Sequence, residues 1–566
     1  MPAVTRESTE APSYSPPPIE LRFARARRAE ASIRPQRRLL IAFLAVIALA
    51  AALDGIVAGS MSPTSDEPDY LAYGQAVLRG QPDRSQTYWD SKTPISALNA
   101  APRALASRLN PGQRAPLAKW LQSIHVARAP SVLATLLLDL FLGLWAYDLF
   151  GMQAALAAFI LAAFAPNLIA HGTLATNDGY FALGVVAALY FFRRYLLDPS
   201  LKNAARSGLA LALAQITKSL AIYLYLVTGI FLVLAFLRRG KSGVSLSRRQ
   251  IITYAATAIV CFAGVINLAY CFDRMFTPLR SYRFESPSFQ KLQKLPVLGA
   301  LPVPLPYPFL QGLDMMKFSD DKGVTYGDIY RLGERRDVLD PQFHNFKSYY
   351  LVAWFFKEPI ALQILFALGL VWIWKHRRRE QFIFEAGPLL AAAIVLVAWL
   401  SLFRKSQIGI RSVLPALAIE IVIAAAPFAY FAFLERRRKI TLGLLALWLC
   451  ISMLSYFPNL IPYFNEWAGS RTNTYRILAD SNLDWGQDTR QVAKFLRHNP
   501  DVVLNPENPV AGRVLVSGNL LAGIYRQHKT LDWLRPYQPV GQVGEAHFLF
   551  VVPAHAQAKT IISARN

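Results

Sequence analysis

Residues 39–70 read LLIAFLAVIALAAALDGIVAGSMSPTSDEPDY. The first part of this stretch is an apolar run that ends near Ala58, and its length is typical of a helix that crosses a membrane. Three carboxylates then follow within four residues, at Asp66, Glu67 and Asp69. Ionisable groups beside a membrane helix are costly to keep near hydrocarbon, which makes them candidates for function. The alternative is the start of an ordinary solvated loop.

The composition of the whole chain supports the membrane interpretation. Of its 566 residues, 54% are hydrophobic and only 17% are charged, which is typical of a polytopic membrane protein. The formal charge is +24, but much of the basic excess lies in short clusters between apolar runs. Membrane topology therefore explains the charge better than binding to nucleic acid, and no nucleic-acid partner is expected. The three cysteines lie in apolar runs and predict neither a disulfide framework nor a metal site.

The apolar runs predict a mainly α-helical fold with about eleven transmembrane helices. The run 208–237 is too long for one span, and Thr217-Lys218-Ser219 interrupts it, so we expect two short helices with Lys218 near the tip. With eleven spans, all five basic clusters fall on the cytoplasmic side, as the positive-inside rule requires. These clusters are 22–38, 193–206, 238–249, 375–379 and 436–439.

The same pattern divides the chain into three parts. Residues 1–38, rich in proline, serine and arginine, predict a disordered basic cytoplasmic tail. Residues 39–457 form the predicted transmembrane domain, with external loops at 59–127 and 272–357. The tail 458–566 contains strand-like segments at 514–516 and 547–552 and helical spacing at 487–498. It predicts a small external α/β domain.

Charged and polar groups of both signs converge on the predicted external face. A cluster of cations at the interface suits a phosphate or pyrophosphate head group, and a nearby carboxylate suits a general base. The alternative is that these are ordinary interfacial side chains that snorkel to water. The set is Asp66, Glu67, Asp69, Lys119, Arg128, His171, Asn177, Asp178, Lys218, Lys357, Arg404, Lys405 and Arg411.

Several short motifs, in order along residues 40–495, resemble those of the GT-C glycosyltransferases. This superfamily includes the protein O-mannosyltransferases and the lipid A aminoarabinose transferase. Each motif is weak alone, but their order, spacing and predicted sidedness make the set specific. The motifs are Asp66-Glu67-x-x-Tyr70, Pro116-Leu117-Ala118-Lys119, Arg128-Ala129-Pro130-Ser131, Ala175-Thr176-Asn177-Asp178, Ile216-Thr217-Lys218, Gly409-Ile410-Arg411-Ser412-Val413-Leu414-Pro415 and Asp480-Ser481-Asn482-Leu483-Asp484-Trp485-Gly486-Gln487-Asp488.

The resemblance implies roles for individual residues. Asp66 would be the base that activates the acceptor, and Glu67 would orient its loop or help to hold a metal ion. Asp178 and Tyr70 would support the site. The candidates for the donor phosphate are Lys119, Arg128, Lys218 and Arg411. No cofactor is certain, and a divalent metal ion stays open, with Glu67, Asp178 and His171 as candidate ligands.

The expected function is therefore that of a multi-pass glycosyltransferase in a bacterial inner membrane, with its active site on the periplasmic side. It would transfer a sugar, with inversion, from a polyprenyl-phosphate donor to a lipid, glycan or protein acceptor. Two alternatives remain. One is a flippase or transporter of lipid-linked sugars, and the other is a membrane scaffold whose C-terminal domain binds a partner.

Overall fold

A computed structural model describes residues 37–83, 93–109, 115–238, 243–323, 327–340, 342–376, 382–525 and 531–554. Most of the expected disordered tail 1–38 and part of the basic cluster 375–379 lie outside these residues. The chain divides into two units, Met1–Ala45 and Val46–Asn566. The first unit contributes, in its described part, only the beginning of helix α2 (Arg37–Ser60).

Among the described residues, six helical segments are long and apolar enough to cross a membrane, or eight if each of two bent helix pairs is one span. This confirms a mainly helical, multi-pass architecture. The six are α2, α6 (Ile124–Phe150), α9 (Asp178–Leu197), η1 with α11 (Ser219–Ile222 and Tyr223–Leu237), α12 (Arg248–Ala269) and Ile410–Phe433, which contains α20 (Leu414–Ala424). The bent pairs are α7 (Met152–Ala163) with α8 (Pro166–Gly172) and α16 (Tyr349–Lys357) with α17 (Ile360–His376).

The described residues therefore contain six to eight of the eleven expected spans, and the other three expected spans fall on shorter or more polar helices. α10 (Leu201–Gln215) and α19 (Gly387–Leu402) have 15 and 16 residues, while α21 (Arg436–Leu454) begins with four basic residues. By length and composition these three fall short of an independent membrane span. The break expected within 208–237 is present, because α10 ends at Gln215 and η1 begins at Ser219.

Helix α20 lies among the other apolar helices and contacts α6, α7, α9, α17 and α19. All its residues except Ala416 are buried, and all except Glu420 are apolar, as expected for a helix enclosed by others. A short 3-10 turn, η3 (Ile410–Val413), precedes it and carries Arg411. The packing of α20 therefore holds this arginine in place.

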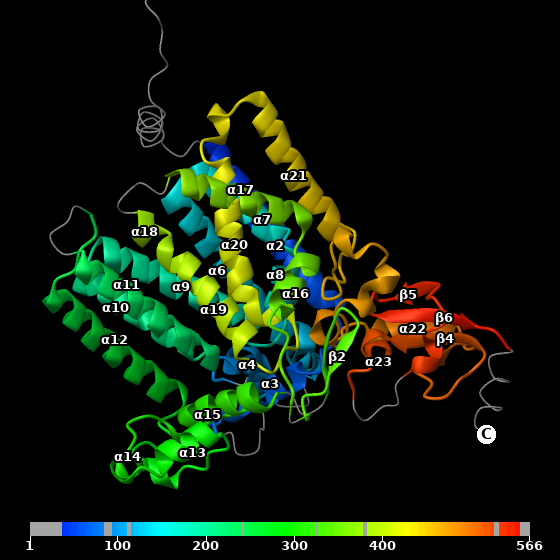
Figure 1. Cartoon of the computed structure of the whole chain (residues 1–566), viewed down its shortest axis with the longest axis horizontal. Coiled ribbons are helices and arrows are strands. Elements are labelled where there is room, and N and C mark those ends of the chain that lie inside the picture. The colour runs from blue at the N-terminus through cyan, green and yellow to red at the C-terminus, as the bar shows by residue number, and fades with distance from the viewer. Residues whose placement is uncertain are drawn as a thin grey trace, which may run out of the picture. The chain divides into compact units, whose positions relative to one another are not determined.

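Shorter elements connect the apolar helices. After α2, α3 (Glu67–Leu78) packs on α4 (Ser96–Ala106), and α4 contacts α5 (Ala115–Gln122) and α6. In Figure 1, α3 and α4 lie below α6, α9 and α20. The connection from α12 to α16 contains η2 (Leu279–Ser281), α13 (Pro287–Gln293), α14 (Pro296–Ala300), α15 (Tyr307–Lys322), and the antiparallel strands β1 (Ile329–Arg331) and β2 (Glu334–Arg336). Helix α18 (Phe382–Glu385) precedes α19, and η4 (Ala426–Phe428) and η5 (Phe431–Phe433) follow α20.

The C-terminal region contains a four-stranded sheet of order β3-β4-β6-β5. Its two long strands, β4 (Gly512–Ser517) and β6 (His547–Val552), are antiparallel, with Ser517 opposite His547. Strands β4 and β6 cover the strand-like segments predicted at 514–516 and 547–552, and a helix covers most of the segment predicted at 487–498. The other elements are η6 (Glu466–Ala468), η7 (Arg471–Arg476), η8 (Asp480–Asn482), α22 (Thr489–His498), β3 (Val503–Leu504), α23 (Gly518–Ala522), η9 (Asp532–Leu534) and β5 (Gly541–Val543).

Close packing of α17 on α20 leads to a test of the helix arrangement. A Cβ atom at Gly369 would lie 2.0 Å from the backbone oxygen of Ile423. Because the obstacle is backbone, we expect Gly369→Ala to separate the helices and to destabilise the protein by about 1–3 kcal/mol. The midpoint of thermal unfolding in detergent measures this.

Gly443→Ala is the matched control, since a Cβ atom there has no neighbour within 4 Å. Alanine also favours a helix more than glycine does. If Gly369→Ala and Gly443→Ala unfold at the same temperature, the close approach of α17 and α20 is incorrect.

Candidate active site

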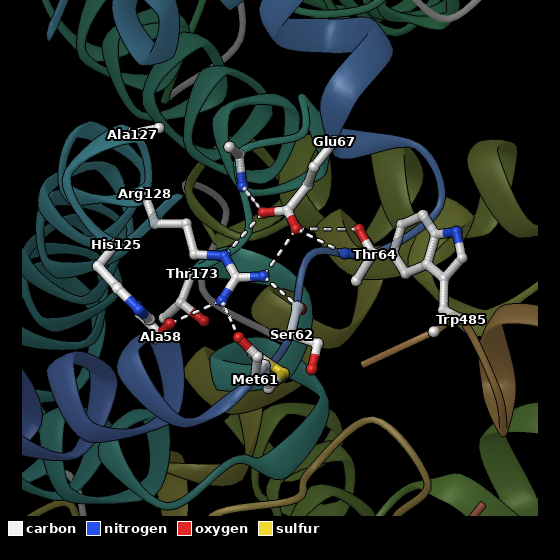
Figure 2. Close-up of polar contacts among 12 residues, drawn as sticks. Ala58, Met61, Ser62, Thr64, Glu67, His125, Ala127, Arg128, Thr173 and Trp485 are labelled. Carbon is white, nitrogen blue, oxygen red and sulfur yellow. Dashed lines mark hydrogen bonds and ion pairs between the residues drawn. The ribbon is translucent and has the colours of Figure 1, made fainter. Parts of the chain in front are cut away.

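A buried ion pair between Glu67 and Arg128 anchors the loop that follows α2 (Figure 2). Arg128 donates from Nε to one carboxylate oxygen of Glu67 at 2.8 Å and from Nη2 to the other at 2.7 Å. Its remaining hydrogen bonds go to the carbonyl oxygens of Ala58, Met61 and Ser62, at 2.7–2.9 Å. The five N–H groups of the guanidinium therefore meet five acceptors within the protein.

The Glu67 carboxylate has further donors. The backbone N–H of Thr64 donates to Oε2 and that of Ala175 donates to Oε1, each at 2.8 Å. Both side chains of the ion pair are 0% exposed. This geometry does not support the phosphate contact expected of Arg128 or the metal contact considered for Glu67. It holds the Glu67 carboxylate against Arg128 and the loop residue Thr64.

A second charged cluster forms around Arg411, and it brings together residues far apart in the sequence. Arg411 donates from Nη2 to Asp66 at 3.3 Å and from Nη1 to Asp178 at 3.5 Å. Its Nε donates to Ser481 Oγ at 3.1 Å, and its guanidinium lies 4.0 Å from the ring centre of Trp485. Arg411 is therefore held between two carboxylates, a hydroxyl group and an aromatic face.

Lys218 joins this cluster through Asp178. Its Nζ donates to Asp178 Oδ1 at 2.7 Å, and the Asp178 side chain is fully buried. Lys218 precedes η1 at the break in the long apolar run, so the interruption of the helix brings its ammonium group to Asp178. The cluster thus contains two cations, Lys218 and Arg411, and two carboxylates, Asp66 and Asp178.

The two carboxylates differ in their access to solvent. The Asp66 side chain is 37% exposed, whereas that of Asp178 is 0% exposed. Asp66 and Glu67 are neighbours at the start of α3, yet Glu67 points into the protein and Asp66 approaches Arg411. Asp66 is consequently the carboxylate of this cluster that an incoming molecule can reach.

The other expected residues are placed differently. Tyr70 is buried and donates its hydroxyl to Asn177 Oδ1 at 3.2 Å, one residue before Asp178. Lys119 is exposed on α5, and within the described part of the chain it makes no hydrogen bond or ion pair with Arg411 or Lys218. His171 is buried, with its ring 6.1 Å from that of Trp485. The described part of the chain contains no group of three side chains that could hold a metal ion.

Sequence reasoning assigned no role to Ser481 and Asn482, although the motif 480–488 pointed to this region, and it named Lys357 only among the charged groups of the expected external face. Asn482 Oδ1 accepts from the N–H of Ile410 at 2.9 Å, next to Arg411. Lys357 is buried and donates to the carbonyl oxygens of Ile461 and Asn482. These contacts hold the motif against η3. The signal that could have found them is the concentration of polar residues in a segment that follows an apolar helix.

The ion pair between Arg128 and Glu67 predicts an order of stability among variants of these two residues. Arg128→Met leaves the Glu67 charge buried without its partner, and we expect a loss of about 3–5 kcal/mol. Adding Glu67→Gln removes that charge, so the double variant should be more stable than Arg128→Met alone. Thermal unfolding of the purified variants checks this order, with Arg108→Met, at an exposed arginine, as the control. A single variant as stable as its control would contradict the role of the pair.

Comparison with known proteins adds an independent finding. Residues 115–268 match the family model described as dolichyl-phosphate-mannose-protein mannosyltransferase. This segment runs from α5 to the end of α12 and includes Arg128, Asp178 and Lys218. No curated protein matches the chain.

Solved structures show a distant similarity. ArnT from Cupriavidus metallidurans, in a crystal structure with undecaprenyl phosphate, has 12% identity and a TM-score of 0.45, over 91% of this chain and 98% of that one. The oligosaccharyltransferase of Archaeoglobus fulgidus has 16% identity and a TM-score of 0.44, over 73% and 54%. The protein O-mannosyltransferase Pmt1-Pmt2 of S. cerevisiae, bound to the sugar donor, has 16% identity and a TM-score of 0.33, over 45% and 38%.

Residues 115–268 of this multi-pass membrane chain are therefore similar to the dolichyl-phosphate-mannose-protein mannosyltransferases, a family of membrane glycosyltransferases.

Proposed function

We propose that this chain transfers a sugar from a polyprenyl-phosphate donor to an acceptor on the external, periplasmic face of an inner membrane, with inversion at the anomeric carbon. The family match supports a lipid-phosphate donor. The observation that carries the proposal is the position of Arg411, which lies between the accessible Asp66 and the buried Asp178.

The cations of the cluster suit the phosphate of the donor. Arginine binds phosphate through two parallel hydrogen bonds, and lysine acts as a point charge. The Nη groups of Arg411 donate to Asp66 at 3.3 Å and to Asp178 at 3.5 Å. Both distances are long for charge-assisted hydrogen bonds. A phosphate can therefore compete for Arg411. Asp66 is the more exposed of the two carboxylates. A phosphate that binds Arg411 therefore replaces Asp66 rather than Asp178.

The released carboxylate has a clear chemical role. The acceptor hydroxyl or amine attacks the anomeric carbon from the face opposite to the phosphate, and Asp66 takes its proton. The bond between the anomeric carbon and the phosphate oxygen breaks, and its electron pair leaves with the lipid phosphate. Arg411 and Lys218 stabilise the charge that develops on this leaving group. The products are the glycosylated acceptor and the free lipid phosphate.

The remaining residues support this chemistry in the proposal. Asp178 positions Lys218 and Arg411, and Tyr70 orients Asn177 beside it. Arg128 holds the loop through Glu67, since its N–H groups already have acceptors. Lys119, exposed on α5, stays a candidate for a second contact with the donor phosphate.

Replacing the proposed base gives the most direct test. Asp66→Asn keeps the shape of the side chain but cannot accept the proton, and we expect transfer to slow by about 10²–10⁴-fold. Transfer is measured with a radiolabelled polyprenyl-phosphate sugar and membranes that contain the chain and its native acceptor. Binding of the donor should persist in this variant.

Asp69→Asn is the matched control, because Asp69 is an exposed carboxylate of the same helix turn. The proposed mechanism is incorrect if Asp66→Asn transfers sugar as fast as this control. It is also incorrect if Asp66→Asn binds the donor no better than a variant of Arg411 does.

Removing the cations tests the phosphate site separately. Arg411→Gln and Lys218→Met should each weaken binding of undecaprenyl phosphate by about 10–100-fold, since a hydrogen bond to a charged group contributes roughly 1.5–3 kcal/mol. Equilibrium binding of labelled undecaprenyl phosphate to the purified chain in lipid nanodiscs measures the effect.

Lys405→Met removes a lysine that lies over the ring of Phe343 rather than in the cluster, so it should leave the affinity unchanged. Equal losses in Lys405→Met and Lys218→Met would assign the lipid binding to general surface charge and would contradict a phosphate site at Lys218.

A further inference from the structure

A cavity of about 400 Å³ opens beside the cluster, in the C-terminal region. This volume lies within the range of small-molecule pockets, about 300–1,000 Å³. Ser65 lines one side, and the segment 484–489, strands β4 and β6 and the residues after α23 supply the others. Ser65 precedes Asp66 in the chain, so the loop that carries the proposed catalytic base also lines the cavity.

The segment 480–488 lies between this cavity and Arg411. The ring of Trp485 contacts the Arg411 guanidinium, and Ser481 accepts a hydrogen bond from it. The two neighbours of Trp485, Asp484 and Gly486, line the cavity instead. One short segment therefore presents one set of residues to the cations and another set to the cavity.

The loop of Asp66 is bonded to this same segment. The N–H of Ser65 donates to the carbonyl oxygen of Trp485 at 2.9 Å, and the N–H of Ser62 donates to that of Gln487 at 2.8 Å. Asp66 is thus held at the border between the two sides. A base in this position can serve a molecule that occupies the cavity.

The cavity wall is rich in groups that accept hydrogen bonds. Asp484 accepts from Ser517 Oγ and from the N–H of Gly486, which holds its carboxylate in place. The Tyr525 hydroxyl accepts from Asn519 at 3.1 Å. Because these side chains are already held by neighbours, they form a pre-organised polar surface, as recognition of a small polar ligand requires.

His547 adds a titratable group to the wall. Its Nδ1 lies 2.9 Å from Asp488 Oδ2, and the Asp488 side chain is fully buried. Burial lowers the pKa of His547, but the hydrogen bond and charge of Asp488 outweigh this effect and raise it overall. The other titratable neighbour on this segment is Asp484. The carboxylates that line the cavity, Asp484 and Glu507, give its wall an acidic character.

We propose that this cavity is the acceptor site and that it receives a hydroxyl- or amine-bearing sugar unit. This inference rests on the proposed glycosyl transfer. Hydroxyl and ammonium groups donate to Asp484 and Ser517, while Leu520 and Leu531 supply apolar surface for the C–H face of a sugar ring. The Asp484 carboxylate repels a phosphate, which favours the Arg411 side for the donor.

Blocking the cavity tests the acceptor site. Thr489 lines it from the exposed start of α22, so Thr489→Trp fills it without touching Arg411. The probes are D-glucosamine, N-acetyl-D-glucosamine and D-glucosamine 6-phosphate, followed by saturation-transfer NMR on the purified full chain. We expect the first two to bind and the phosphate to bind at least several-fold more weakly. Thr489→Trp should reduce binding at least tenfold.

Two controls accompany this variant. Thr489→Ser keeps a hydroxyl group at the same place, and Ala493→Trp adds an exposed tryptophan elsewhere on α22; both should bind like the parent chain. Leu520→Trp fills the cavity from another wall and should reproduce Thr489→Trp. Unchanged sugar binding in both blocked variants, no binding of any probe, or tightest binding of the phosphorylated sugar would overturn the acceptor site.

Binding of undecaprenyl phosphate, measured on the same samples, separates this inference from the proposed function. Blocked variants that lose the sugars but keep the lipid phosphate support the acceptor site and also show that the chain is folded. If Arg411→Gln keeps the lipid phosphate while Thr489→Trp loses the sugars, the donor site fails and the cavity stands. If Arg411→Gln loses the lipid phosphate while Thr489→Trp keeps the sugars, only the cavity fails.

Discussion

The hydrogen bonds of Arg128 to Glu67 and to three backbone carbonyls are the interaction on which the site depends. A buried arginine without partners would be strongly destabilising, and a buried glutamate equally so. Here each satisfies the other, and the carbonyl oxygens at the end of α2 take up the remaining N–H groups. The chain between Ala58 and Glu67 is consequently held along its length. The adjacent Asp66 is thereby placed toward Arg411.

The Arg411 cluster shows why such an anchor is needed. Two cations and two carboxylates from four distant parts of the chain meet there, and their charges balance. A phosphate that binds to this cluster adds negative charge, so one carboxylate must give up its place. Asp178 is fully buried and has Lys218 at 2.7 Å, whereas Asp66 is partly exposed and has the longer contact to Arg411. In the proposed mechanism, this difference in burial makes Asp66 the carboxylate that is released.

Much of this architecture follows from the sequence, because hydropathy and charge are local properties. The apolar runs, the break at Lys218 and the strands near 514–516 and 547–552 were predicted from them. The count of eleven spans required helices such as α10, which at 15 residues does not pass as a span by itself. The sequence could not separate Arg128 from Arg411, since each lies near a proline at the beginning of an apolar helix. Only the folded chain reveals that carbonyl oxygens surround one and carboxylates the other.

The segment 480–488 lies between the proposed donor phosphate site and the proposed acceptor cavity, and this position suits an inverting attack on the anomeric carbon. Inversion requires that the attacking group and the leaving phosphate lie on opposite sides of the anomeric carbon. Ser481 and Trp485 contact the cation that suits the phosphate, while Asp484 and Gly486 line the cavity that suits the acceptor. Because Ser65 is bonded to Trp485, Asp66 stays at the border of the two sides. A sugar that crosses this border would have its phosphate among cations and its anomeric carbon open to the base-assisted attack.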